Sequence, residues 1–458
     1  ATTCKVIIPN TSTPIAFSLT PAQRIAEISI PYSSAYISEA ETGQVINKGI
    51  QVVVDPGQPP VVVYAHVFVS ARSAASLILP TPVLGKRYIT ANCYQQSNDL
   101  SSRSQFQVVA VEDNTNIRII PRLNGIPGSE ILITLPFRGD VYQYQSTQDL
   151  TGTLIESVES ASGGSCKRFA VFSGSSSVAI ETINGCNLNE SNSIDPLFQQ
   201  LFPINSWGKK YAFVPFAEYA NGNPYRVLAA ENGMDVYENG VYRATLSAVF
   251  ITANKPISVA QYAQMARCRD AMPYYLGDPD MLLLNPIEQG VNNITVFTSL
   301  KENISKRYIQ VVMRQAAASS FKINGVSLPA TSSWTPMQPA SSGFVYNKII
   351  IDPSSTTNSF TLTADSDFVA SVYGFGDKES YAYSAGANFK DLSQSLNTLN
   401  GDTLIDFPAS CTGTPMKFSI SSPYQASSIK WDFGGLFLFA GGAQDTSRLC
   451  RLFNNFDR

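Results

Sequence analysis

The stretch PVVVYAHV at residues 60–67 recurs along the chain in altered form. Its counterparts are RFAVFSGS at 168–175, PISVAQYA at 256–263 and FVASVYGFG at 368–376. Counted from Val61, Phe169, Ile257 and Phe368, the intervals are 108, 88 and 111 residues. Such intervals exceed the short periods of solenoids and propellers, and they match the length of one sandwich domain. Because short β-branched and aromatic runs between turn residues are typical of strands, the recurrence predicts four related all-β units.

The length of the chain supports a division into several units. A chain of 458 residues is too long for one core, so three or four domains are expected. We predict tandem antiparallel β-sandwich-like units at residues 1–75, 76–183, 184–275 and 276–390, followed by a β region at 400–458. Propeller-like closure of the repeats is the alternative architecture.

A second pattern opens three of the units. A proline is followed five residues later by a glycine, two basic residues and a tyrosine, in LILPTPVLGKRY at 77–88 and LFPINSWGKKY at 201–211. A looser version surrounds Pro286. The strands that follow each opening are predicted to form hairpins, the first around the turn residues Asp113 and Asn114. Short helices are expected only at residues 195–201 and 391–396, where Asp stands at the N-cap.

The composition limits the classes of partner and the cellular locations that are expected. Charged residues make up 15% of the chain, the net charge is -3 and no basic run occurs, so nucleic acid is not an expected partner. No stretch approaches 18 consecutive apolar residues, and no transmembrane segment is expected. The chain starts at Ala1, which suggests a processed N-terminus from which a signal peptide has been removed. A polar surface with few charges favours an extracellular or cell-surface location.

The seven cysteines show no C-x-x-C spacing, so a zinc or redox motif is not supported. Candidate disulfides join Cys166 to Cys186 and tie down the C-terminal region through Cys411 and Cys450. Buried free thiols in a reducing compartment are the alternative. Sequons, which become glycan sites only in a suitable secretory pathway, start at Asn10, Asn189, Asn293 and Asn303.

Groups able to perform chemistry are few. His66 is the single histidine, so a multi-histidine metal site is impossible, and its apolar neighbours indicate a structural role. The pairs Asp278 and Asp280, and Asp365 and Asp367, are interpreted as turn residues because the other oxygen ligands of a calcium loop do not follow. We therefore predict a non-enzymatic protein with no catalytic residue, no metal ligand and no cofactor.

One aromatic cluster is a candidate ligand contact. Tyr373, Phe375, Tyr381 and Tyr383 lie among glycines near the end of the fourth unit. Aromatic rings in such a setting can stack on sugars or contact a protein. Packing in the core is the alternative role of the same rings.

Several motifs, in order from about residue 46 to residue 386, resemble the IgGFc-binding protein N-terminal domain family. They are LGKRYI, VVAVEDNTNIRI, KRFAVFSG, WGKKYAFVPF, NKPISVAQY, GDPDMLLLNPIEQ and YGFGDKESYAYSAG. Residues 429–434, IKWDFG, resemble the start of a PKD-type module, although Gly435 stands where that pattern has Asp. The resemblance implies a secreted, non-enzymatic binding or surface-structural protein.

The leading hypothesis is an extracellular adhesion or structural protein that binds a protein or glycan ligand through sheet edges and unit seams. A carbohydrate-binding array is the first alternative, and it requires solvent-exposed coplanar rings. A self-assembling fibre or surface-layer subunit, which would be a homo-oligomer or filament, is the second. A hydrolase of surface polymers would need two acids in one cleft, and no such pair stands out in the sequence.

Overall fold

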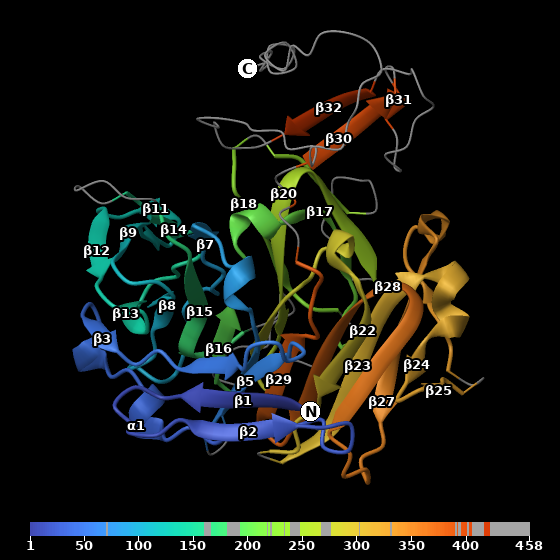
Figure 1. Cartoon of the computed structure of the whole chain (residues 1–458), viewed down its shortest axis with the longest axis horizontal. Helices are drawn as coiled ribbons and strands as arrows, with labels where there is room; N and C mark the ends of the chain where they lie inside the picture. Colours follow the sequence, from blue (N-terminus) through green and yellow to red (C-terminus); the bar gives the residue numbers. More distant parts are fainter. Residues whose placement is uncertain are drawn as a thin grey trace. The chain divides into compact units, whose positions relative to one another are not determined.

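Antiparallel sheets dominate the structure, a computed structural model, which confirms the all-β prediction (Figure 1). The only α-helical turn of the described residues, α1, is Tyr32–Ala35, and 3-10 turns lie at Glu39–Glu41, Thr81–Val83, Ile204–Ser206, Ile287–Gln289, Gln315–Ser320 and Ala340–Ser342. The structure describes residues 1–69, 72–159, 166–180, 193–217, 219, 222–232, 234–238, 248–266, 276–301, 303–329, 332–389, 392, 395–400, 403–404 and 416–421.

The first half of the chain forms small and medium-sized sheets. One sheet has the spatial order β2 (Ile15–Leu19), β1 (Thr2–Ile7) and β4 (Gln51–Val54). Two-stranded sheets are β5 (Val63–Phe68) with β6 (Ser73–Ile78), and β10 (Arg122–Leu123) with β11 (Ile126–Pro127). A four-stranded sheet has the order β12 (Ile131–Leu135), β9 (Thr115–Ile120), β14 (Leu154–Ser157) and β7 (Arg87–Ile89). A five-stranded sheet has the order β16 (Asp195–Gln200), β15 (Phe169–Val178), β8 (Ser104–Ala110), β13 (Asp140–Ser146) and β3 (Val45–Asn47).

The second half is built on two long strands. The first, β20 (Val249–Ala263), pairs with β17 (Gly208–Phe213), β18 (Tyr225–Ala229), β19 (Val236–Glu238) and β21 (Asp280–Leu283). The second, β28 (Ser359–Gly376), pairs with β22 (Val291–Phe297), β23 (Ile304–Arg314), β24 (Lys322–Ile323) and β29 (Glu379–Ser384). The same sheet continues through β25 (Val326–Ser327), β27 (Phe344–Ile351) and β26 (Thr335–Pro336). A last sheet is β31 (Thr403–Leu404), β30 (Ser395–Asn400) and β32 (Met416–Ser421).

Each recurring strand pairs with the strand that follows it. The pairs are β5 with β6, β15 with β16, β20 with β21 and β28 with β29. The second members also contact one another in turn, β6 with β16, β16 with β21, β21 with β29 and β29 with β6. We call the place where β6, β16, β21 and β29 meet the strand junction. Gln199 of β16 connects these strands, because its Nε2 lies 2.7 Å from the carbonyl oxygens of Ala75 and Met281 and 3.1 Å from that of Ala382.

Propeller-like closure, the alternative architecture, is not formed. A propeller repeats four-stranded blades around a central channel. The β5–β6 pair remains a two-stranded sheet among the described residues, with no late strand added to it.

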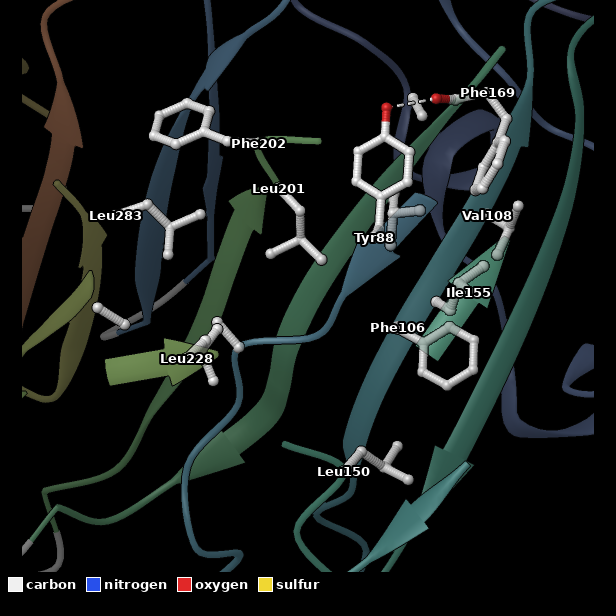
Figure 2. Close-up of a cluster of buried hydrophobic side chains, with 14 of the residues drawn as sticks. Tyr88, Phe106, Val108, Leu150, Ile155, Phe169, Leu201, Phe202, Leu228 and Leu283 are labelled. Carbon is white, nitrogen blue, oxygen red and sulfur yellow. Dashed lines mark hydrogen bonds between the residues drawn. The ribbon is translucent and has the colours of Figure 1, made fainter. Parts of the chain in front are cut away.

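The proline–glycine–tyrosine pattern has the same structure in two units. A 3-10 turn follows the proline, and the glycine N–H then donates to the tyrosine hydroxyl, from Gly85 to Tyr88 at 2.9 Å and from Gly208 to Tyr211 at 3.1 Å. Each hydroxyl donates in turn to a carbonyl of the recurring strand, that of Phe169 for Tyr88 (Figure 2). The tyrosine therefore anchors the opening segment to the recurring strand.

The glycines of this pattern lie at the seams between units. A Cβ added to Gly85 would lie 2.4 Å from the Cβ of Pro203, and one added to Gly208 would lie 2.3 Å from the Cβ of Pro286. Only glycine allows this approach, since real Cβ atoms do not come so close. The glycine of the first opening thus lies against the proline of the second, and the glycine of the second lies against the proline of the third.

The predicted hairpins are wrong. β8 pairs with β13 and β15, whereas β9 pairs with β12 and β14, so the turn at Asn114 connects two sheets. Phe106 and Val108 of β8 and Ile155 of β14, which pairs with β9, are fully buried in one cluster, and this shared core joins the two sheets (Figure 2). Likewise β18 and β19 both pair with β20 and not with each other.

The helix predicted at residues 195–201 is also wrong, since Asp195–Gln200 is β16. Leu197 and Gln199 are buried at a period of two, and Asp195 accepts a hydrogen bond from the Ser73 N–H at 3.1 Å instead of capping a helix. In the second predicted helix, at 391–396, residues 395 and 396 begin strand β30.

The contacts group Ala1–Lys390 into one compact unit and Asp391–Arg458 into another. Within the first unit, strand β6 spans the predicted 75/76 boundary, and one hydrophobic cluster extends from Leu77 to Leu283. This cluster draws on three of the predicted ranges, 76–183, 184–275 and 276–390, so these do not have separate cores. The motif that resembles a PKD module, at 429–434, lies outside the described residues.

Candidate interaction surface

The predicted aromatic contact set belongs to the core. Tyr373, Phe375, Tyr381 and Tyr383 are each at most 1% exposed. The Tyr373 hydroxyl accepts a hydrogen bond from the Ala217 N–H at 2.9 Å. A sugar platform needs a ring face open to solvent, and β28 and β29 are covered on both sides where these rings lie. These four rings therefore pack in the core, which is the alternative role considered for them.

An exposed aromatic pair lies elsewhere, at the two ends of α1, where Tyr32 is the first helical residue and Tyr36 is the C-cap. The rings of Tyr32 and Tyr36 stack with centroids 4.6 Å apart and planes 17° apart, and the residues are 69% and 48% exposed. Because each ring covers one face of the other, the pair offers two separate outer faces and no continuous platform.

His66 lies on β5 in a structural setting. Its Nδ1 is 3.2 Å from the Ser299 hydroxyl, and the structure gives it no carboxylate partner among the described residues. Burial, assisted by the positive charge of Lys301, lowers the pKa of His66 to about 4, so the ring is neutral at pH 7. Asp365 and Asp367, interpreted as turn residues, instead lie exposed within β28.

Asp278 and Asp280 are buried and not exposed turn residues. They meet Asp195 and Glu379 at the junction of the paired strands, and all four residues are at most 1% exposed. Burial raises the pKa of Asp280, and burial followed by the charges of Asp278, Glu379 and Asp280 raises the pKa of Asp195. Even so, no three His, Cys, Asp or Glu side chains of the described residues are placed to hold a metal ion.

The cysteines of the described residues, Cys4, Cys93 and Cys166, form no disulfide with one another. Cys186, Cys411 and Cys450 lie outside the described residues, so both candidate disulfides stay predictions. Burial raises the pKa of Cys93 to about 11, which makes this thiol a poor nucleophile at neutral pH.

The most distinctive exposed feature is the outer edge of β12. This strand, ILITL, ends its four-stranded sheet and pairs only with β9 among the described strands (Figure 1). It carries no charge and no proline, and Leu132 is 66% exposed. Ile126 and Phe137, close in sequence, are 70% and 67% exposed. An unprotected edge of this kind is a template for pairing with another strand.

The solvent face of the same sheet carries a row of charges that stops at β12. In register across the sheet lie Leu132, Arg118, Glu156 and Arg87. The Arg118 Nε donates to Glu156 at 2.8 Å, the Arg87 Nε lies 3.1 Å from the same carboxylate, and Arg118 also reaches Glu130 at 3.4 Å. The charges therefore satisfy one another, and the row ends in an apolar side chain at the open edge.

Other edges are shorter, contain proline or carry less exposed apolar side chains. β26 contains Pro336, which cannot donate to a further strand, and β7 and β3 are three residues long. β5 is the closest counterpart, since it pairs only with β6 and contains no proline, but Val67 and Phe68 at its end are 48% and 44% exposed, less than Leu132. β2 has five uncharged residues, and its most exposed large apolar side chain, Ile15, is 37% exposed. The alternation in residues 131–135 is visible in the sequence, whereas the position of this strand at an edge depends on long-range pairing.

No helix in the described part of the chain is long and apolar enough to cross a bilayer. A family model described as IgGFc binding protein matches residues 74–374, which is more than half of the chain. Searches of curated proteins and of solved structures returned no significant match.

Proposed function

The chain belongs to the IgGFc-binding protein family, and from this membership we propose that it is an extracellular, non-enzymatic adhesion or structural protein that binds a protein partner. The observation that carries the proposal is the unprotected edge of β12 with Leu132 at its centre. A partner segment in extended conformation adds to this edge as a further strand.

The chemistry of the edge defines the partner segment. Main-chain hydrogen bonds to β12 supply affinity without regard to sequence, and side chains opposite β12 supply selectivity. The residue facing Leu132 is apolar, because an apolar cross-strand pair removes both side chains from water. A charged residue opposite Leu132 adds little binding free energy, since Arg118, Glu130 and Glu156 already pair with one another.

The size of the edge favours a flexible segment over a second folded copy. Five residues of strand extend about 17 Å. A stable protein–protein interface buries about 800 Å² on each partner, which is more than one short strand pair provides. Self-association, the alternative function, would need a further surface, and native mass spectrometry across concentration tests it separately.

A binding experiment on the full chain tests the proposal. The probes are an immunoglobulin G Fc fragment, suggested by the family description, and an array of ten-residue peptides. We expect an apolar, β-branched class of peptide to bind the wild type, Leu132→Lys to weaken it at least tenfold, and Ser18→Lys on β2 to leave it unchanged. Ligands that bind both lysine variants as tightly as the wild type would contradict the role of β12.

A further inference from the structure

A groove of about 700 Å³ lies between an N-terminal segment and the sheet of β28. One wall is residues 21–25, and the floor includes Ser359, Thr361 and Thr363. These three alternate along β28, so their side chains share one face of the sheet. The groove is widely open to solvent, so a ligand bound in it stays partly exposed.

The wall is held in place by its own turn and by contacts to the floor. Thr20 and Gln23 exchange backbone hydrogen bonds at 2.9 and 3.1 Å. Arg24 donates through Nε to the Pro21 carbonyl at 3.2 Å and through Nη1 to the Thr361 hydroxyl at 2.9 Å. The guanidinium is therefore positioned across the groove before any ligand arrives.

The groove has an uncompensated positive charge. Arg24 alone is charged among the described residues that line it, and it forms no ion pair with a carboxylate of the described residues. The nearby Glu27 is neutralised by Lys301 at 3.2 Å and accepts a hydrogen bond from Asn358. Lys322 stands directly opposite Thr363 in the register of β24 and β28, and the exposed Asp365 follows Thr363 by two residues on the same face, so Arg24 remains the charge without a carboxylate partner.

The remaining lining supplies neutral hydrogen-bonding groups. Asn324, Asn358, Ser359 and Thr363 contribute amide and hydroxyl groups, whereas the Thr361 hydroxyl is already bonded to Arg24 and lies 3.0 Å from the Thr295 hydroxyl. No aromatic side chain lines the groove. Hydroxyl and amide groups match the hydroxyls of a sugar, and the guanidinium matches a carboxylate or sulfate. We propose that this groove binds an acidic oligosaccharide, with Arg24 holding its anionic group.

The pairing of the floor strand argues against a peptide ligand. Residues 359–363 of β28 pair with β22 on one side, and Leu362 and Thr363 pair with β24 on the other. At Leu362 and Thr363 both edges of the floor strand are therefore paired, and recognition there relies on side chains. This site and the β12 edge rest on different residues, so either holds without the other.

Isothermal titration of the full chain with a heparin-derived tetrasaccharide tests the proposal, with cellotetraose as the neutral control. We expect the acidic sugar alone to bind, with an affinity that falls as salt rises because a charge pair contributes. Arg24→Gln weakens binding at least tenfold and Thr361→Val several-fold. Arg138→Gln, which removes an exposed arginine elsewhere, leaves binding unchanged and controls for net charge.

Three outcomes would overturn the proposal. The first is no binding of the tetrasaccharide at millimolar concentration. The second is equal binding by the wild type and Arg24→Gln, or equal binding of the neutral sugar. The third is Arg24-dependent binding of a hexaglutamate peptide without binding of the tetrasaccharide. Thr361→Val keeps the guanidinium of Arg24 and removes only the hydroxyl that orients it, so weaker binding by this variant does not depend on a changed charge.

Discussion

Leu132 on β12 lies directly opposite Arg118 on β9. The row of charged side chains across this sheet therefore ends at the sheet edge in an exposed apolar side chain. Arg118 is turned toward Glu156 and Glu130, and the hydrogen bonds and charge of Glu156 raise its pKa further. The edge therefore combines a free strand backbone with a side chain that gains from being covered. This arrangement links the fold to the proposed binding of an extended segment.

The seam between Gly85 and Pro203 predicts a strong steric effect. Gly85→Ala would place a Cβ 2.4 Å from the Pro203 Cβ, and the expected loss of unfolding free energy is about 1–3 kcal/mol. Urea denaturation measures it. Adding Pro203→Gly removes the clashing atom, so the double variant should lose less than the sum of the single changes. Strict additivity would show that the two residues do not form a seam.

Removal of the Tyr88 hydroxyl should lower the free energy of unfolding measurably. Tyr88→Phe leaves the Gly85 N–H without an acceptor and the Phe169 carbonyl without a donor, at a cost of about 1–3 kcal/mol. Thermal unfolding followed by circular dichroism measures the loss. Tyr32→Phe, at an exposed tyrosine, is the control and should change the midpoint little. An equal effect of both changes would refute the anchoring role.

Gln199 should be the most sensitive single position at the strand junction. Gln199→Leu keeps a side chain of similar size but removes the donor to the Ala75, Met281 and Ala382 carbonyls. We expect a loss of about 3 kcal/mol or a failure to fold in the same yield. Gln148→Leu, at an exposed glutamine, controls for the change in polarity. Unchanged stability of the Gln199 variant would mean that the junction does not depend on this amide.

His66 should make stability depend on pH. Its pKa is lowered to about 4 in the folded state, below the 6.5 of an unfolded chain, so the unfolded state binds the proton more tightly. Its contribution is fully present above pH 6.5 and is lost as pH falls toward 4, by at most about 3 kcal/mol. Urea midpoints at pH 7.5, 6 and 5 measure it. His66→Gln should flatten this part of the curve, and an unchanged slope would exclude His66 as its source.

Local patterns predict the strands well because burial imposes a period of two. The alternation in residues 106–110 puts Phe106, Val108 and Ala110 on one face, and all three are buried. The recurring strands and the Pro–Gly–Tyr openings also fold alike in several units. Each of these features depends on neighbours within a few residues.

Long-range choices are not visible in the sequence. A turn at Asn114 suits a hairpin and a sheet-to-sheet connection equally, and only the shared core decides between them. The aromatic cluster around Tyr373 and the acid Asp195 likewise owe their burial to strands far along the chain. The exposure of Leu132 is the same kind of property, since it depends on which strand is last in its sheet.

The central claim is that β12 receives an extended partner segment, and hydrogen–deuterium exchange of the full chain tests it most directly. The exchange of amides in Ile131–Leu135 is compared with and without a peptide selected from the array. The account predicts new protection of these amides on binding, absent in Leu132→Lys, while amides of β2 exchange as before. Protection that appears elsewhere while β12 exchanges unchanged would contradict it.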